Sequence, residues 1–221
     1  MKFSQKQEEI LNKLNQEKKK YYIVGGYVRD YLLSYEPNDL DIEIYNTTIE
    51  ELKKIFHNYE YEIFFAYGVF KFKNINVSIS LPRIDIKKNK KGYHNVKCII
   101  NPNLPVDIAY LRRDITINSL YYDPQEKVYI DYVEGINDIN NKIIRAISFN
   151  FIDDPMRLYR LIKFIIKNPV FKIEDNTYKM CLKMNYKELT LLKQKELEKI
   201  KNDLIRKKNL TIGEKQILNF L

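Results

Sequence analysis

The sequence lacks tryptophan, has only two histidines and two cysteines, and contains no long apolar run. Cys98 and Cys181 lie far apart without a pairing pattern, which predicts free thiols and a reducing, cytoplasmic compartment. His57 and His94, with no Cys-x-x-Cys, argue against a zinc site or a histidine–aspartate phosphohydrolase cluster. No stretch approaches the ~20 apolar residues that cross a bilayer, and the first residues lack a signal-peptide core.

The composition is that of a soluble globular protein, and its positive charge is unevenly placed. The 221 residues are 45% hydrophobic and 30% charged, which allows one large domain or two small ones. Residues 156–221 hold 16 Lys and Arg against 7 Asp and Glu, so they carry the whole net charge of +9. This excess indicates contact with a polyanion, or a solvated helical surface rich in lysine; charge alone favours neither.

Hydrophobic periodicity predicts an α+β fold: a mixed sheet with flanking helices over residues 1–150, then a helical part over 151–221. The expected strands are 21–24, 40–45, 61–65, 69–72, 76–81, 96–100 and 127–131. The expected helices are 4–18, 27–33, 48–57, 154–167, 174–182, 187–206 and 211–221. Residues 84–95 are basic and polar without apolar period, which predicts a loop.

The stretch 24–41 combines a paired glycine turn, an arginine on a short helix and two alternating aspartates. Gly25 and Gly26 let a backbone approach phosphates closely, and Arg29 can pair with a phosphate oxygen. Asp39 and Asp41 alternate on a strand, where they could hold magnesium. Together these features indicate an enzyme that handles a nucleoside triphosphate.

Glu43 continues the alternation, so three carboxylates are expected on one strand face. Such a face can be merely solvent-exposed, but after Gly-Gly-x-x-Arg it suits phosphoryl transfer with metal ions. We therefore expect Asp39 and Asp41 to be catalytic metal ligands for two Mg²⁺ ions.

A second charged cluster is Arg112-Arg113-Asp114, which precedes an apolar segment containing Asn118. It can be a surface ion pair of little energetic value. The functional interpretation makes Arg113 a phosphate or base contact and Asp114 an acceptor for a ribose hydroxyl, with Asn118 in the same candidate set.

The third cluster begins a helix. Pro155 at its first position makes Asp154 a natural N-cap, which is also its simplest structural explanation. Arg157, Arg160 and Lys163 follow in steps of three along one side. Arg157 can offer a donor fork to a base edge while Asp154 accepts from an exocyclic amine.

With these clusters in order, the chain resembles the class II tRNA nucleotidyltransferase and bacterial poly(A) polymerase family of polymerase β-type nucleotidyltransferases. The resemblance rests on GGYVRDYLL with DLD, on RRDITINS at 112–119, on Asp131-Tyr-Val-Glu-Gly135 and on Asp153-Asp154-Pro-Met-Arg157. It implies a head that binds ATP or CTP with magnesium, and a neck whose side chains select the base. The basic segment 84–95 falls where the family has a flexible loop needed for A addition.

The resemblance implies a template-independent enzyme that adds CCA to tRNA 3′ ends. The alternatives are a poly(A) polymerase, a CC-only or A-only enzyme, and a catalytically silent tRNA-binding protein. By position, Gly26, Arg29, Arg113, Asp154, Arg157, Arg160 and Lys163 would contact the nucleotide.

Three departures from the family pattern accompany the resemblance. Ser78 stands where relatives usually carry an acid, which leaves open whether Glu43 replaces that carboxylate. Lys163 stands where arginine is common and lacks the planar fork. Relatives continue into body and tail domains, so RNA is expected to be held by the basic last third, by a homo-oligomer or by a partner protein.

Overall fold

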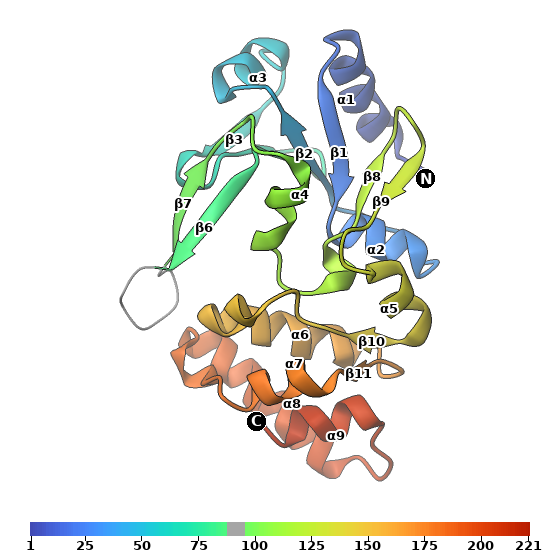
Figure 1. Cartoon of the computed structure of the whole chain (residues 1–221), viewed down its shortest axis with the longest axis vertical. Helices are drawn as coiled ribbons and strands as arrows, with labels where there is room; N and C mark the ends of the chain where they lie inside the picture. Colours follow the sequence, from blue (N-terminus) through green and yellow to red (C-terminus); the bar gives the residue numbers. More distant parts are fainter. Residues whose placement is uncertain (88–95) are drawn as a thin grey trace. The chain divides into compact units, whose positions relative to one another are not determined.

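The computed structural model describes residues 1–87 and 96–221, and Figure 1 shows their course. They form two compact units. The first comprises Met1–Ile86, Cys98–Arg113 and Asn118–Ile136. The second comprises Asp114–Ile117, Asn137–Leu221 and the described part of Lys87–Lys97. The Arg113–Asp114 bond is thus a division point between the units, whereas the functional division expected at residue 150 stays a prediction.

The first unit is built on a seven-stranded mixed sheet with the order β3-β4-β5-β2-β1-β8-β9. Its strands are β1 Lys20–Val24, β2 Leu40–Tyr45, β3 Tyr61–Phe64, β4 Val69–Phe72, β5 Val77–Ser80, β8 Tyr121–Asp123 and β9 Val128–Ile130. Only the β2–β5 pair is parallel, and its register sets Asp41 beside Ser78 and Glu43 beside Ser80. The predicted strands of this sheet are confirmed, and β8 lies in an apolar stretch to which the sequence assigned no element.

Four helices belong wholly to this unit: α1 Gln5–Gln16, α2 Gly26–Leu32, α3 Ile49–Ile55 and α4 Val106–Ala109. α1 begins at a capping box in which Ser4 and Gln7 exchange side-chain and backbone hydrogen bonds. Its apolar stripe is buried as predicted, since Ile10 and Leu14 are fully covered.

A separate two-stranded sheet consists of β6 Arg83–Lys87 and β7 Val96–Ile100. The loop predicted over 84–95 is therefore wrong for residues 84–87, which alternate polar and apolar side chains as an exposed strand can. The remaining residues, 88–95, lie outside the described part of the chain.

The second unit is mostly helical, with α6 Pro155–Lys167, α7 Asp175–Cys181, α8 Leu191–Arg206 and α9 Ile212–Leu218. Figure 1 shows these helices in orange to red. The unit also contains a parallel pair, β10 Ile143–Ile144 with β11 Lys172–Ile173, which the helical pattern did not predict. Helix α5 Gly135–Asn141 spans the division between the units. Short 3₁₀ turns occupy Phe65–Tyr67, Tyr110–Arg112, Thr116–Asn118, Phe149–Asp153 and Tyr186–Glu188.

Both cysteines are free, as the sequence predicts, and Cys181 is buried. Among residues 1–87 and 96–221, no helix has the length and apolar character that crossing a bilayer requires.

Candidate active site

The glycine turn after β1 brings together three residues that are distant in sequence. Gly25 has φ 70° and ψ −136°, a conformation that side-chain-bearing residues rarely adopt. A Cβ on Gly25 would lie 3.4 Å from Nη1 of Arg113 and 3.8 Å from Oδ2 of Asp41. The missing side chain therefore leaves room for an arginine and a carboxylate against the backbone.

Arg29 lies across the first turn of its own helix. Its guanidinium donates to Oδ1 of Asn118 at 2.6 Å and pairs with Asp30 at 2.6 Å. Its Nη2 lies 3.4 Å from where a Cβ of Gly26 would be. The structure thus joins Arg29 with Asn118, two predicted site residues 89 positions apart.

Asp39 and Asp41 line a cleft of about 380 Å³, which Lys71, Lys73 and Ser78 also line. Both aspartates are exposed to solvent. Oδ1 of Asp41 accepts a hydrogen bond of 2.6 Å from the Ser78 hydroxyl. Desolvation by surrounding protein atoms raises the pKa of Asp41, and repulsion from Asp39 adds to this, whereas the Ser78 hydrogen bond and Arg113 oppose it. Two carboxylates that repel each other at a solvent-open cleft favour a bound cation.

The two carboxylates are oxygen donors of the kind that Mg²⁺ binds. Within the described residues there is no group of three His, Cys, Asp or Glu side chains that could hold a metal. Mg²⁺ is commonly bound through one or two carboxylates, with water and substrate phosphates as its other ligands. Asp39 and Asp41 are such a pair, and both are accessible from the cleft.

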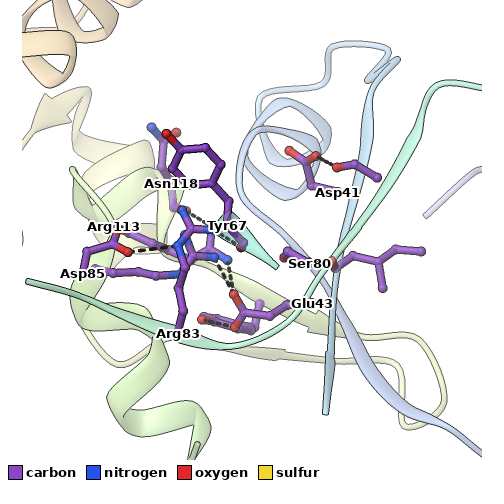
Figure 2. Close-up of polar contacts among 12 residues, drawn as sticks. Asp41, Glu43, Tyr67, Ser80, Arg83, Asp85, Arg113 and Asn118 are labelled. Atoms are coloured by element: carbon purple, nitrogen blue, oxygen red, sulfur yellow. Dashed lines mark hydrogen bonds and ion pairs between the residues drawn. The ribbon is translucent and has the colours of Figure 1, made fainter. Parts of the chain in front are cut away.

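Glu43 cannot serve as the third carboxylate of this cleft. Its side chain is fully buried and accepts hydrogen bonds from the hydroxyls of Tyr45 at 2.7 Å and Tyr121 at 2.9 Å. Its other oxygen pairs with Arg112 at 2.7 Å and Arg113 at 3.3 Å, as Figure 2 shows for Arg113.

These contacts use both oxygens of Glu43. Burial alone would raise the pKa of Glu43, but the two guanidinium groups outweigh it and the pKa is lowered. The possibility that Glu43 ligates metal in place of an acid at position 78 is therefore wrong, because the carboxylate is already paired.

Three neighbouring residues fix the orientation of the Arg113 side chain. Its guanidinium stacks over the ring of Tyr121 at 5.0 Å and donates to the backbone oxygen of Asn118 at 3.4 Å. Only 11% of its side chain is exposed, and within the described chain its Nε has no hydrogen-bond acceptor. Glu43, Tyr121 and Asn118 therefore hold Arg113 beside Gly25 in one orientation.

Lys71 and Lys73 were missed by the sequence interpretation. They alternate with the buried Phe70 and Phe72 at the end of β4, so both ammonium groups are on the exposed face. This two-residue period was the signal that could have found them. No described carboxylate forms an ion pair with either lysine, and each places a positive charge in the Asp39–Asp41 cleft.

In the second unit, the structure joins two other predicted residues. Arg160 donates through Nε to Oδ2 of Asp114 at 2.8 Å, and Asp114 also accepts from the backbone N–H of Ile115 at 2.9 Å. Asp114 is 7% exposed, whereas the Arg160 side chain is 47% exposed. Asp114 therefore anchors Arg160, and its expected contact with a ribose hydroxyl stays a prediction.

The start of α6 is built as expected. Asp154 is the N-cap and accepts from the backbone N–H of Met156 at 2.8 Å. Arg157 donates to the backbone oxygen of Asn150 at 2.8 Å. Lys163 forms an ion pair with Glu196 of α8, a partner that the sequence interpretation did not identify.

Comparison with known proteins shows the family to which the chain belongs. Residues 21–145 match the family described as the poly A polymerase head domain. The chain is 32% identical over 166 residues to a CCA-adding enzyme of Actinobacillus succinogenes, covering 74% of this chain and 40% of that protein. It is 35% identical over 160 residues to a CCA-adding enzyme of Francisella tularensis subsp. novicida, covering 72% and 42%. The chain thus spans about two fifths of the length of these relatives.

Solved structures share the fold. The Bacillus stearothermophilus CCA-adding enzyme in complex with CTP superposes with a TM-score of 0.62 at 20% identity, over 89% of this chain and 45% of that one. A tRNA nucleotidyltransferase complexed with a primer tRNA and an incoming ATP analog gives 0.62 at 23% identity, over 93% and 57%.

Proposed function

Because the chain belongs to the poly(A) polymerase head-domain family, we propose that it extends RNA 3′ ends, adding C and A to tRNA from CTP and ATP. The observation that carries this proposal is the exposed pair Asp39 and Asp41 in a cleft beside the Gly25 turn. The naming of the similar proteins from Actinobacillus and Francisella as CCA-adding enzymes favours this activity over poly(A) synthesis.

Asp39 and Asp41 would hold Mg²⁺, which when bound activates the attacking 3′-hydroxyl and neutralises charge on the pyrophosphate leaving group. The protein's own part is to hold both carboxylates open to the cleft. Ser78 contributes by donating to Asp41, because a hydrogen bond to the charged form favours that form.

Arg29 and Arg113 would contact the triphosphate. Each guanidinium is oriented by a fixed partner, Asn118 for Arg29 and Glu43 for Arg113. The Gly25 turn leaves the space beside Arg113 free of side-chain atoms. Prior orientation matters because a donor that is already aligned loses little entropy when the phosphate binds.

We assign nucleotide transfer to residues 1–150, and base reading and RNA binding to residues 151–221. In the latter, Arg157 and Arg160 present planar donor forks suited to the base edges of C and A, and Asp154 is a candidate acceptor. Lys163 is a weaker candidate, because Glu196 pairs with its ammonium group.

The test is incorporation of labelled CTP and ATP into tRNA transcripts that lack the last one, two or three nucleotides. We expect C, C and A to be added in order and addition to stop there. Asp41→Asn should abolish incorporation, whereas Asp203→Asn, at an exposed position of α8, should leave it unchanged.

Long tails of A alone would identify a poly(A) polymerase, and addition of C alone a CC-adding enzyme. Binding of tRNA without incorporation, even with manganese, would show a silent binding protein. Sedimentation of the protein with and without tRNA would show whether it acts as a homo-oligomer.

A further inference from the structure

The first unit contains a second cavity, of about 770 Å³. None of the residues to which the proposed function assigns a role lines it. Its walls come from the chain before and at the start of α1, from α2 and the turn after it, and from the turn before β5. This volume is within the range of small-ligand sites. The part contributed by residues 2–7 lies outside residues 21–145, which match the family.

The cavity combines aromatic rings with cations. Tyr31 and Tyr35 line it and are 38% and 42% exposed, so their rings are accessible to a ligand. Lys2 and Lys6 also line it, together with one carboxylate, Glu36, and neither lysine forms an ion pair with a described residue. Rings that can stack on a base, next to ammonium groups that can neutralise a phosphate, suit a nucleotide in a single strand.

Buried polar contacts hold the walls together. The side-chain amide of Gln7, which is 5% exposed, donates to the backbone oxygen of Asn38 at 3.0 Å. The hydroxyl of Tyr27 donates to the backbone oxygen of Lys2 at 2.8 Å, and its ring stacks on Phe3 at 5.8 Å. The N-terminal segment is therefore attached to α2 and to the turn before β2, so the cavity is largely formed before any ligand binds.

The cavity adjoins the Asp39–Asp41 cleft. Ile75 and Asn76 line both spaces. Asn38, which lines the cavity, directly precedes Asp39 and accepts a hydrogen bond of 2.9 Å from Asn76. An RNA strand whose 3′-hydroxyl lies at the aspartates can therefore continue into this cavity without leaving the surface of the unit.

We propose that this cavity binds one nucleotide of the single-stranded RNA 3′ end, with its base against Tyr31 and Tyr35 and its phosphate near Lys2 and Lys6. The inference rests on the proposed function, because that function supplies the RNA strand. A free nucleotide shares the same chemistry, so the experiment must separate the two sources.

The direct test is fluorescence anisotropy of the full chain with a labelled single-stranded RNA of about ten nucleotides. We expect Tyr31→Leu with Tyr35→Leu to weaken binding by at least about fivefold, the loss that follows removal of one base–aromatic stack. Tyr35→Phe should bind like wild type because the ring is retained. Lys6→Ala should lower the affinity for RNA and make that affinity depend less steeply on salt concentration. Lys54→Ala, at an exposed position of α3, should change neither quantity.

A second readout is primer extension with the same variants. The KM for tRNA should rise several-fold, while kcat and the KM for CTP stay unchanged. Zero-length photocrosslinking from 4-thiouridine near the RNA 3′ end should label Tyr31 or Tyr35.

The outcomes separate the two proposals. Variant-sensitive RNA binding without nucleotide incorporation would refute the proposed function and support the cavity. Normal incorporation with equal RNA affinity in wild type and the double variant would refute the cavity alone. Displacement of the RNA by ATP from wild type but not from the double variant would assign the cavity to a free nucleotide and overturn the RNA inference.

Discussion

Ser78 donates a 2.6 Å hydrogen bond to Asp41 across the parallel pair β2–β5. The hydroxyl donates to Oδ1 of the carboxylate, while Oδ2 lies 3.8 Å from where a Cβ of Gly25 would be. The Ser78 hydroxyl is thus a neutral donor to an aspartate whose pKa is raised by desolvation and, to a smaller extent, by repulsion from Asp39. The contribution of Ser78 to metal binding at Asp41 can therefore be tested by substitution.

Removal of this hydrogen bond should weaken the cation site without unfolding the protein. Ser78→Ala should raise the pKa of Asp41 further, because the hydrogen bond that favours the charged form is lost. We expect the magnesium concentration needed for half-maximal incorporation to rise about fivefold, because the lost hydrogen bond contributes ~1 kcal/mol. Ser80→Ala is the matched control, since its hydroxyl donates to the backbone oxygen of Ile42. Equal magnesium dependence in both variants would contradict this role.

Glu43 should act through stability and not through metal binding. Glu43→Gln would leave two arginines beside a neutral amide in a buried site, and breaking such a pair costs about 3–5 kcal/mol. Urea denaturation should show this loss, whereas Glu50→Gln, a 68% exposed partner of Lys53, should unfold like wild type. A changed magnesium requirement with unchanged stability would instead make Glu43 a ligand.

Gly25 and Gly26 should differ in how well they tolerate substitution by alanine. Gly25→Ala places a methyl group at positive φ and 3.4 Å from Arg113, so it should lower incorporation at least about tenfold, with a backbone cost of ~1 kcal/mol or more. Gly26 does not have a positive φ, and a Cβ there would lie at an ordinary contact distance of 3.4 Å from Nη2 of Arg29, so Gly26→Ala should be milder. The comparison needs kcat/KM for CTP and a thermal melt of each variant. Equal losses would refute the strain argument.

Asp123 should make stability depend on pH. Its carboxylate is 3% exposed and accepts from Lys20 at 2.6 Å and from the backbone N–H groups of Gln125 and Glu126. Burial opposes ionisation, but these donors outweigh it and the pKa of Asp123 is lowered. Its stabilisation is therefore complete above the unfolded pKa of about 4 and is lost as pH falls through the lower folded value.

The variant Asp123→Asn tests this dependence. It should cost ~1–3 kcal/mol at neutral pH and progressively less below about pH 4. Urea titrations at several pH values would measure both proteins. A penalty that is constant with pH would contradict the carboxylate's role.

Arg160 should read the base through its planar fork. Arg160→Lys keeps the charge but loses the Nε bond to Asp114 and the paired donors. We expect the ratio of kcat/KM for CTP over ATP to change by about tenfold, and Arg206→Lys, at the exposed end of α8, to leave it unchanged. An equal fall in kcat/KM for CTP and ATP would show that Arg160 does not select the base.

Local patterns predicted much of the fold. Alternation over 40–45 and 69–72, the spacing of Ile10, Leu11 and Leu14, and the Asp154-Pro155 start of α6 are each visible in a short window. The short pair β10–β11 was missed, because two-residue strands contain too few side chains for a period to be seen. Residues 84–87 were predicted as a loop, because the sequence analysis grouped them with the basic, polar residues that follow them.

Short motifs in the sequence are sufficient to predict the family and the candidate residues, because Gly-Gly-x-x-Arg, Asp-x-Asp and Arg-Arg-Asp each occupy a few neighbouring positions. Which of the three alternating carboxylates face solvent depends instead on tertiary packing. Asp41 lies near the start of its strand beside Ser78. Glu43, two residues on, is enclosed by the neighbouring Tyr45 and by Arg112, Arg113 and Tyr121, which come from 69 to 78 positions away. Strand alternation sets the face of a side chain, but burial depends on what the rest of the chain packs against that face.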